Sequence, residues 1–341
     1  MKKPEKIRVG ISVGDLNGIG IEIILKTFED NRMLDFCTPI IFAANKVISY
    51  HKKALNSSTN VFGIDNLNKV AHNKLNLLNI WKEVVDIELG KPTKISGKYA
   101  FESLKSATKA LKDNDIDVLV TAPINKHNIQ SDEFHFKGHT EYLEDNFEGE
   151  SLMILMTDAL KIGLITGHIP VSEVASTITP QLITKKVEIM HTTLVQDFNI
   201  AKPRIAVLGL NPHCGDNGVI GLEDNEIIAP TLQEISNTGK LVFGPYAADS
   251  FFGSKNYKKF DGVLAMYHDQ GLAPFKTLAF GDGVNYTAGL DKIRTSPDHG
   301  TAYEIAGKGV ANNSSFKEAL FRAIAIYKTR NEYKLLIKNK L

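Results

Sequence analysis

The chain has 341 residues, 43% of them hydrophobic, which predicts a globular protein of one large or two ordinary domains. Forty basic residues against 39 acidic ones leave a net charge of +1, so neither nucleic acid nor a charged membrane surface is indicated as a partner. The two cysteines, Cys37 and Cys214, exclude a disulfide framework and favour the cytoplasm, and no apolar run reaches the roughly 18 residues of a membrane span.

Short apolar runs alternate with longer amphipathic stretches, which predicts an α/β fold with a largely parallel sheet. Strands are expected, in chain order, at residues 7–13, 39–43, 117–121, 152–157, 160–166, 204–208 and 262–265. Helices are expected at residues 19–29, 46–54, 97–113, 180–198 and 315–328. Only Asp158 and Ala159 separate two of the strands, so this pair is expected to be an antiparallel hairpin in a mixed sheet. The polar stretches 56–68 and 211–221 are expected to be loops.

The first strand leads into a glycine-rich turn, Gly14-Asp-Leu-Asn-Gly18-Ile-Gly20-Ile-Glu22, which opens a helix. Glycines there allow the backbone to turn tightly and to approach a ligand, and a helix N-terminus favours an anion. The spacing matches neither the dinucleotide fingerprint nor the phosphate-binding P-loop. The turn is therefore open to two interpretations, a plain strand-to-helix connection or a binding loop.

Three segments framed by glycine or proline each present a histidine just after a predicted strand: His168, His213 and His268. Such loops commonly carry catalytic and ligand groups in α/β enzymes. Three imidazoles meeting at one point would make an open divalent-metal site with room for water or substrate. The alternative is that each is an ordinary exposed or hydrogen-bonded residue, since no local spacing motif joins them. Cys214 is expected to be a packed thiol, although it lies beside His213.

Other polar groups in predicted loops suit an anionic ligand. Lys126 follows a strand and is either a solvated lysine or a ligand contact. His139 and Thr140 open a predicted helix, where Thr140 either caps the helix or helps to bind a phosphate or hydroxyl group. Asp249 is a candidate acid whose structural alternative is a helix cap.

Residues 263–302 contain the densest group of hydrogen-bond donors in the chain. Lys276, Asn285 and Arg294 suit a phosphate and a carboxylate, because cations bind these groups through charge-assisted hydrogen bonds. So many donors in short stretches bounded by glycine and proline exceed what a folding loop needs, and we expect this segment to be functional.

Seven short motifs follow one another along the chain. They are Gly-Asp-x-x-Gly-Ile-Gly-x-Glu (14–22), Thr-Ala-Pro-Ile-Asn-Lys (121–126), Gly-His-Thr-Glu (138–141), Thr-Gly-His-Ile-Pro (166–170), Gly-Leu-Asn-Pro-His (209–213), Tyr-His-Asp-Gln-Gly-Leu-x-Pro-x-Lys (267–276) and Arg-Thr-Ser-x-Asp-His-Gly-Thr-Ala (294–302). Together and in this order they resemble the 4-hydroxythreonine-4-phosphate dehydrogenase family. The resemblance extends from residue 7 to about residue 328.

The resemblance implies the fold of the isocitrate and isopropylmalate dehydrogenases, a two-domain α/β fold with a mixed sheet. One domain would comprise residues 1–125 plus 290–341 and the other residues 126–289, with the active-site cleft between them and the dimer interface in the second. The family's metal ligands fall on His168, His213 and His268. Its substrate contacts fall on His139, Thr140, Lys276, Asn285 and Arg294. The family is homodimeric, with each metal shared between subunits.

The activity implied is oxidation of 4-(phosphooxy)-threonine by NAD or NADP, with decarboxylation to 3-amino-2-oxopropyl phosphate, in pyridoxal 5′-phosphate biosynthesis. A divalent metal (Zn, Mg, Mn or Co) would assist, and the family's NAD site is not a Rossmann fingerprint. The group that removes the hydroxyl proton stays open among Asp249, Asp269 and Lys126.

Two other functions stay open. One is a sister dehydrogenase acting on a four-carbon sugar-acid 4-phosphate such as threonate or erythronate 4-phosphate. Asp291 bears on this alternative, because it puts a carboxylate near Arg294 where family members commonly have proline. The other is a metal-dependent lyase or hydrolase that uses the three histidines without NAD.

Overall fold

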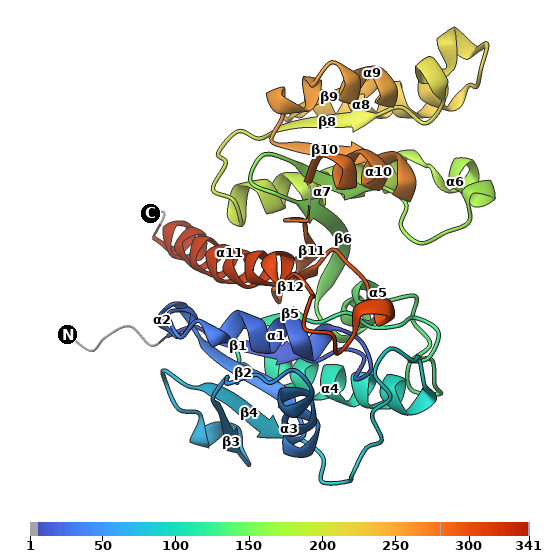
Figure 1. Ribbon diagram of the computed structural model, residues 1–341. Coiled ribbons are helices and arrows are strands. Elements are labelled where there is room, and N and C mark those ends of the chain that lie inside the picture. The colour runs from blue at the N-terminus through green and yellow to red at the C-terminus, as the bar shows by residue number, and fades with distance from the viewer. Residues whose placement is uncertain (1–5, 280, 340–341) are drawn as a thin grey trace. The chain divides into compact units, whose positions relative to one another are not determined.

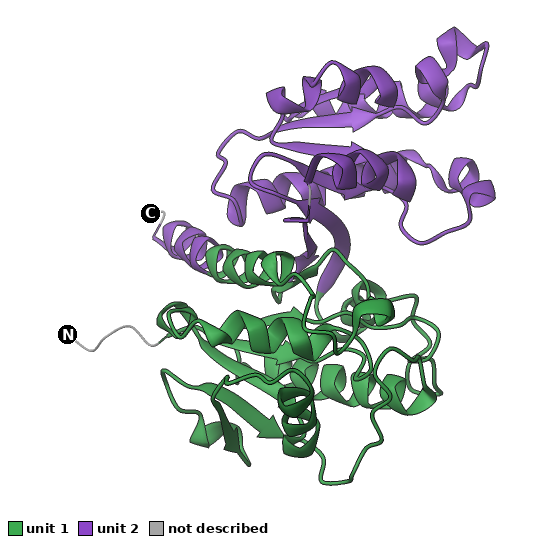
Figure 2. Cartoon of the chain, in the orientation of Figure 1, with its two compact units in different colours: residues 1–148, 291–327 green, residues 149–290, 328–341 purple. Residues whose placement is uncertain are grey.

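The computed structural model describes residues 6–279 and 281–339, which belong to two compact units (Figures 1 and 2). Unit 1 comprises residues 1–148 and 291–327, and unit 2 comprises residues 149–290 and 328–341. Residues 126–148, which the predicted domain borders assign to the central domain, cluster with unit 1. The domain assignment itself stays a prediction.

The strands of unit 1 lie in the order β3-β4-β2-β1-β5-β12, and all these neighbours pair in parallel. Their bounds are β1 (Arg8–Ser12), β2 (Thr38–Ala43), β3 (Val61–Ile64), β4 (Leu75–Asn79), β5 (Val118–Thr121) and β12 (Arg294–Pro297). The helices are α1 (Gly20–Glu29), α2 (Met33–Phe36), α3 (Asn45–Ala54), α4 (Lys94–Lys112), α5 (His139–Asn146) and the short η1 (Leu67–Lys69) and η5 (Tyr303–Ile305). Strand β2 is buried along its whole length, as expected for a parallel strand covered on both faces.

Helix α4 shows why the local sequence folds as it does. Thr93 and Ser96 form a capping box at its start, in which each side chain bonds the other residue's backbone N–H. Ala100, Leu104 and Leu111 recur at helical spacing and are buried against the sheet. The predicted helix at residues 97–113 is confirmed, with its start three residues earlier, at Lys94.

The strands of unit 2 lie in the order β11-β6-β7-β10-β8-β9. Their bounds are β6 (Gly149–Met156), β7 (Lys161–Leu164), β8 (Arg204–Leu208), β9 (Leu241–Tyr246), β10 (Gly262–Ala265) and β11 (Val284–Leu290). Strand β6 is antiparallel to β11 and β7, and the remaining pairs are parallel, so the predicted hairpin and mixed sheet are confirmed. The helices are α6 (Val171–Thr177), α7 (Pro180–Gln196), α8 (Ala229–Asn237), α9 (Ala248–Gly253), α10 (His268–Ala279) and the short η2 (Pro212–Gly218), η3 (Asp224–Ile228) and η4 (Asn256–Lys259). Helix α11 (Ser314–Lys338) contributes residues to both units.

Some sequence predictions were wrong or incomplete. The stretch 56–68, predicted as a loop, contains β3, whose two central residues are exposed and therefore give no apolar run. Strands β4, β9, β11 and β12 were not predicted, and α11 extends to Lys338 rather than to residue 328. His268 is the first residue of α10, not part of a loop. Thr140 does not cap α5, because the N-cap is Gly138 and no side-chain capping bond forms there.

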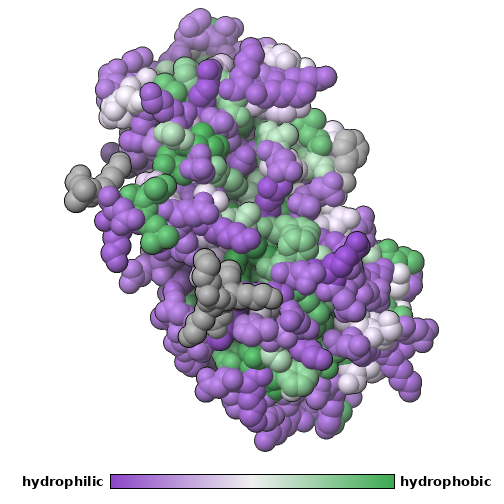
Figure 3. Space-filling model, turned by 90° about the vertical axis from the view of Figure 1, so that its left-hand side faces the viewer, coloured by the Kyte–Doolittle hydropathy of each residue, from purple (hydrophilic) through white to green (hydrophobic). Residues whose placement is uncertain are grey.

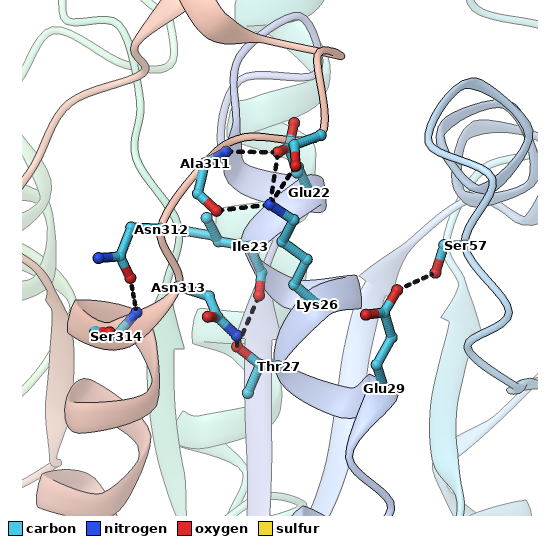
Figure 4. Close-up of polar contacts among 11 residues, drawn as sticks. Glu22, Ile23, Lys26, Thr27, Glu29, Ser57, Ala311, Asn312, Asn313 and Ser314 are labelled. Atoms are coloured by element: carbon cyan, nitrogen blue, oxygen red, sulfur yellow. Dashed lines mark hydrogen bonds and ion pairs between the residues drawn. The ribbon is translucent and has the colours of Figure 1, made fainter.

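The glycine-rich turn of residues 14–22 is closely packed against other segments of unit 1. A Cβ on Gly14 would lie 2.2 Å from the carbonyl oxygen of Pro123, and Gly14 has a φ of +66°. At the end of the motif, the buried carboxylate of Glu22 accepts a hydrogen bond from the Ala311 N–H at 2.8 Å (Figure 4). Lys26 joins the same contact by donating to the carbonyl oxygen of Ala311. These contacts support the structural interpretation of the turn.

The surface is mixed in polarity. On the face drawn in Figure 3, hydrophilic residues predominate and hydrophobic residues form smaller groups among them. None of the helices in the described part of the chain combines the length and the apolar character needed to cross a bilayer.

Candidate active site

Arg294 is the centre of a charged region in unit 1. It begins β12, pairs in register with Leu119 of β5, and is only 3% exposed. Its Nε and Nη2 atoms donate to Thr121 Oγ1 at 3.0 and 2.6 Å. Burial lowers the pKa of Arg294 to about 9, and the carboxylate of Glu141 acts in the opposite direction. A buried guanidinium binds anions through charge-assisted hydrogen bonds, so this position suits an anionic ligand.

His139 lies close to this guanidinium. It is the first residue of α5, and its Nε2 atom is buried without a hydrogen-bond partner among the described residues. Desolvation, together with the positive charges of Arg294 and Lys126, holds the pKa of His139 well below its usual value. The imidazole is therefore expected to be neutral at pH 7. Thr140 follows at the N-terminus of the same helix, where backbone N–H groups favour anions.

Two of the three histidines lie side by side in unit 2. His168 lies between β7 and α6, His268 opens α10, and their ring centroids are 5.5 Å apart. Asp269 Oδ1 lies 2.6 Å from Nδ1 of His268, which leaves Nε2 of His268 available as a ligand. A carboxylate on the far nitrogen is the usual support for a metal-binding imidazole.

His213 lies apart from this pair. It is exposed, in a turn whose residues 213–217 all have positive φ values between 44° and 78°. Among residues 6–279 and 281–339, no group of three or more His, Cys, Asp or Glu side chains is close enough to hold a metal ion. The structure of one chain thus brings His168 and His268 together and leaves His213 outside, and the three-histidine site stays a prediction.

The remaining predicted substrate contacts belong to unit 2. Lys276 is exposed in the last turn of α10. Asn285 lies on β11, paired with Leu155 of β6, and its Oδ1 atom is buried without a partner among the described residues. The five predicted contacts are therefore divided, with His139, Thr140 and Arg294 in unit 1 and Lys276 and Asn285 in unit 2.

The three candidate bases differ in their surroundings. Asp269 is engaged with His268, as described above. Asp249 is exposed in the first turn of α9, and its charge helps to raise the pKa of Cys214 after desolvation by burial and the charge of Asp224. It therefore lies near the turn that carries His213. Lys126 is exposed, and its charge is felt by His139.

Sequence reasoning missed Thr121 as a site residue. Its hydroxyl holds the guanidinium of Arg294, although 173 residues separate the two. The available signal was its position at the carboxyl end of a predicted strand, where α/β proteins place ligand contacts. Gln270, within the motif of residues 267–276, was also given no role; its contacts are described below.

Comparison with known proteins gives consistent matches along almost the whole chain. The family model for the pyridoxal phosphate biosynthetic protein PdxA matches residues 35–323. A 4-hydroxythreonine-4-phosphate dehydrogenase from Bacteroides thetaiotaomicron is 52% identical over 338 residues, which are 98% of this chain and 93% of the relative. A protein from Oceanobacillus iheyensis, provisionally assigned as a D-threonate 4-phosphate dehydrogenase, is 36% identical and covers 94% of this chain and 97% of its own length.

A solved structure allows the fold to be compared directly. The 4-hydroxythreonine-4-phosphate dehydrogenase from Klebsiella pneumoniae superimposes with a TM-score of 0.80 at 30% sequence identity, covering 96% of this chain and 99% of that one. The expected mixed-sheet α/β fold is confirmed.

Proposed function

The chain belongs to the pyridoxal phosphate biosynthetic protein PdxA family, and we propose that it catalyses the 4-hydroxythreonine-4-phosphate dehydrogenase reaction. In this reaction NAD oxidises the secondary alcohol of 4-(phosphooxy)-threonine, and the resulting β-keto acid loses CO₂ to give 3-amino-2-oxopropyl phosphate. The observation that carries the proposal is the buried guanidinium of Arg294 close to the buried imidazole of His139, in a chain 52% identical to a relative of that name.

Arg294, His139, Thr140 and Lys126 would bind the substrate phosphate. Arg294 is already oriented by Thr121, so little side-chain freedom would be lost on binding. The buried Nε2 of His139 would gain the partner that it lacks in the described structure. Lys276 and Asn285 would contact the remaining polar groups of the substrate.

His168 and His268 fit a shared divalent ion, since their rings lie 5.5 Å apart and Asp269 supports one of them. An ion held there supplies positive charge that lowers the pKa of a bound hydroxyl and stabilises negative charge developing on oxygen. Three imidazoles favour Zn intrinsically, but availability also decides among Zn, Mg, Mn and Co. Bound NAD, or NADP, supplies the hydride acceptor.

The third histidine would come from a second copy of the chain. His213 is outside the pair in one chain, and exposed apolar residues flank the loops concerned: Val219 is 82% exposed and Val171 is 79% exposed. Large exposed apolar side chains around an incomplete site support an interface there. A homodimer would thus place His213 of one copy beside His168 and His268 of the other.

Of the candidate bases, Asp249 is the one we propose to accept the hydroxyl proton. Asp269 is occupied in orienting His268. Lys126 lies close enough to His139 for its charge to lower the pKa of that imidazole, and it suits phosphate binding. The two cysteines are free, which supports a reducing compartment, and we propose the cytoplasm as the place of action.

The experiment that tests this function measures reduced nicotinamide by absorbance with each candidate substrate. NAD reduction should be fastest with 4-(phosphooxy)-threonine. Faster reduction with threonate or erythronate 4-phosphate would favour the sister dehydrogenase, a second candidate supported by the Oceanobacillus relative and by Asp291 beside Lys292 near Arg294. Substrate consumption that needs the metal but no nicotinamide would favour the lyase or hydrolase.

A further inference from the structure

The segments that carry the three histidines follow neighbouring strands of unit 2. Strand β10 pairs in parallel with β7 on one side and with β8 on the other. The carboxyl ends of these strands therefore lie at the same edge of the sheet. His168 follows β7, His213 follows β8 and His268 follows β10, so a group that bridges these strand ends constrains how the three segments of one chain lie relative to one another.

Gln270 is such a group. It lies on α10, two residues after His268, and its Oε1 accepts a hydrogen bond from the Met266 N–H at 2.7 Å. Its Nε2 donates to the carbonyl oxygen of Gly209 at 2.6 Å, in the segment that leads to His213. Both polar ends of one amide side chain thus connect the segment after β10 with the segment after β8.

The third segment joins at the same residue, Met266. The carbonyl oxygen of Met266 accepts from the Thr166 N–H at 3.1 Å and from Thr166 Oγ1 at 2.6 Å. Thr166 is two residues before His168 and is buried. The Met266 residue is therefore bonded through its N–H to Gln270 and through its C=O to Thr166, which links all three histidine segments in a continuous hydrogen-bonded chain.

Asp224 supports the His213 segment from its other side. Its carboxylate, 0% exposed, accepts from the N–H groups of Leu210 and Asn211 at 2.9 and 3.0 Å. A Cβ on Gly209 would lie 2.7 Å from this carboxylate, so glycine is required for the close approach. The left-handed residues 213–217 follow directly, and such a backbone persists only where its surroundings fix it.

We propose that Gln270 is a positioning residue that fixes, within each chain, the His213 segment relative to the His168 and His268 segments, with Asp224 as the second support of the His213 segment. In the proposed dimer each chain gives His213 to one metal site and His168 and His268 to the other, so this fixed geometry is what aligns the ligands of both sites. The proposal rests on the proposed function, because it assumes that these histidines bind a divalent ion. Gln270 itself would not touch the metal or the substrate.

The test compares full-length Gln270→Met with Gln270→Glu. Methionine keeps the approximate length of the side chain and removes both hydrogen bonds, whereas glutamate keeps an acceptor for Met266 and loses the donor to Gly209. Gln233→Met is the matched control, because Gln233 is exposed on α8 and bonds only to Asn237 in the described structure. The probe is Co²⁺, whose affinity and visible absorption spectrum report the number and geometry of its ligands.

Gln270→Met should bind Co²⁺ about 10- to 100-fold more weakly than the parent and with an altered spectrum, which is the range for lost support of metal ligands. The Co²⁺ affinity of Gln270→Glu should lie between those of Gln270→Met and the parent, and Gln233→Met should have the affinity and spectrum of the parent. Equal affinity and equal spectra for the parent and Gln270→Met would overturn the proposal. If Gln270→Met fails to fold, Thr166→Val can replace it. This variant removes only the hydrogen bond from Thr166 Oγ1 to Met266 and should give a smaller loss of Co²⁺ affinity.

Hydrogen exchange of the metal-free protein separates this inference from the proposed function. The amides of Gly209, Leu210, Asn211 and His213 should exchange faster in Gln270→Met than in the parent or in Gln233→Met. Suppose that neither the parent nor any variant bound Co²⁺ but the exchange difference was present. The proposed metal site would then be refuted, and the link that Gln270 makes between the segments would still be supported. An absence of the exchange difference would refute the bracing whatever the metal result.

Discussion

The two units hold their candidate site residues in different ways. In unit 1, Arg294 is buried within a strand and held by a side chain of the neighbouring strand. In unit 2, the histidines follow the ends of strands, on segments that backbone hydrogen bonds and the side chain of Gln270 hold together. The proposed phosphate contacts Arg294, His139 and Thr140 thus all belong to unit 1 of one chain, whereas the described residues of one chain do not complete the proposed three-histidine site in unit 2. A buried charge is costly unless polar groups of the same chain compensate it. A half-buried or exposed metal ligand stays solvated, so its site can be completed by a second copy of the chain.

The largest expected effect tests whether unit 2 needs a second copy. His168→Ala and His213→Ala should each reduce turnover about a thousandfold or more and lower bound metal, because the ion contributes several kcal/mol to the transition state. Mixing the two inactive proteins should restore activity. Each heterodimer would have one site with all three histidines and one site lacking two.

Activity after verified subunit exchange should approach half the normal value per heterodimer. No recovery would mean that His168 and His213 reach each metal from the same chain. Repeating the mixing with His268→Ala would then show whether any ligand crosses between copies.

Arg294→Ala addresses unit 1. Removing the guanidinium should raise KM for the phosphorylated substrate about 10- to 100-fold, the range of a charged hydrogen bond of about 1.5–3 kcal/mol. Metal content should not change, because the histidines belong to unit 2. Arg32→Ala, at an exposed arginine of unit 1, is the control. Equal use of the unphosphorylated alcohol by the parent enzyme would contradict the phosphate assignment.

The dependence of unfolding free energy on pH tests whether a buried histidine of unit 1, His51, stays neutral in the folded protein. Burial lowers the pKa of His51 to about 4, although a backbone hydrogen bond involving Leu16 opposes the shift. The unfolded chain gains a proton near pH 6.5 and the folded chain does not, so stability is lost as pH falls from about 6.5 towards 4. Between pH 7 and 5 this single group should cost about 2 kcal/mol of unfolding free energy.

Denaturant unfolding at the two pH values measures this loss. His51→Gln should show a loss about 2 kcal/mol smaller than the parent, while His127→Gln, at an exposed position, should behave like the parent. Identical pH dependence in all three proteins would show that His51 is not held neutral.

The smallest effect compares helix caps in the two units. Thr179→Ala at the start of α7 should cost about 1 kcal/mol, because it removes the acceptor for the Leu182 N–H. Thr93→Ala at the start of α4 should cost up to about 2 kcal/mol, because Thr93 also accepts from Asn17 Nδ2 at 3.2 Å. Thermal unfolding measures both, and an equal cost would mean that the Asn17 contact adds nothing.

The sequence alone determined the features that depend on near neighbours. The alternation of strands and helices, the hairpin around Asp158, and the presence of helix α4 follow from periodicity and connection length. The start of α4 was placed three residues too late, because its capping box was not recognised. The order of the seven motifs also indicated the family, which the comparisons show. Strand β3 gave no apolar run in the sequence, because it is an edge strand and its two central residues are exposed.

The tertiary structure decided what depends on distant segments meeting. Only the pairing of β5 with β12 places Thr121 against Arg294 and buries that cation. Only the order β7-β10-β8 brings Gln270, Met266 and Thr166 together and sets His168 beside His268. Hydrophobic periodicity specifies which face of a strand is buried, but not which strand becomes its neighbour, because that choice depends on the packing free energy of the whole unit.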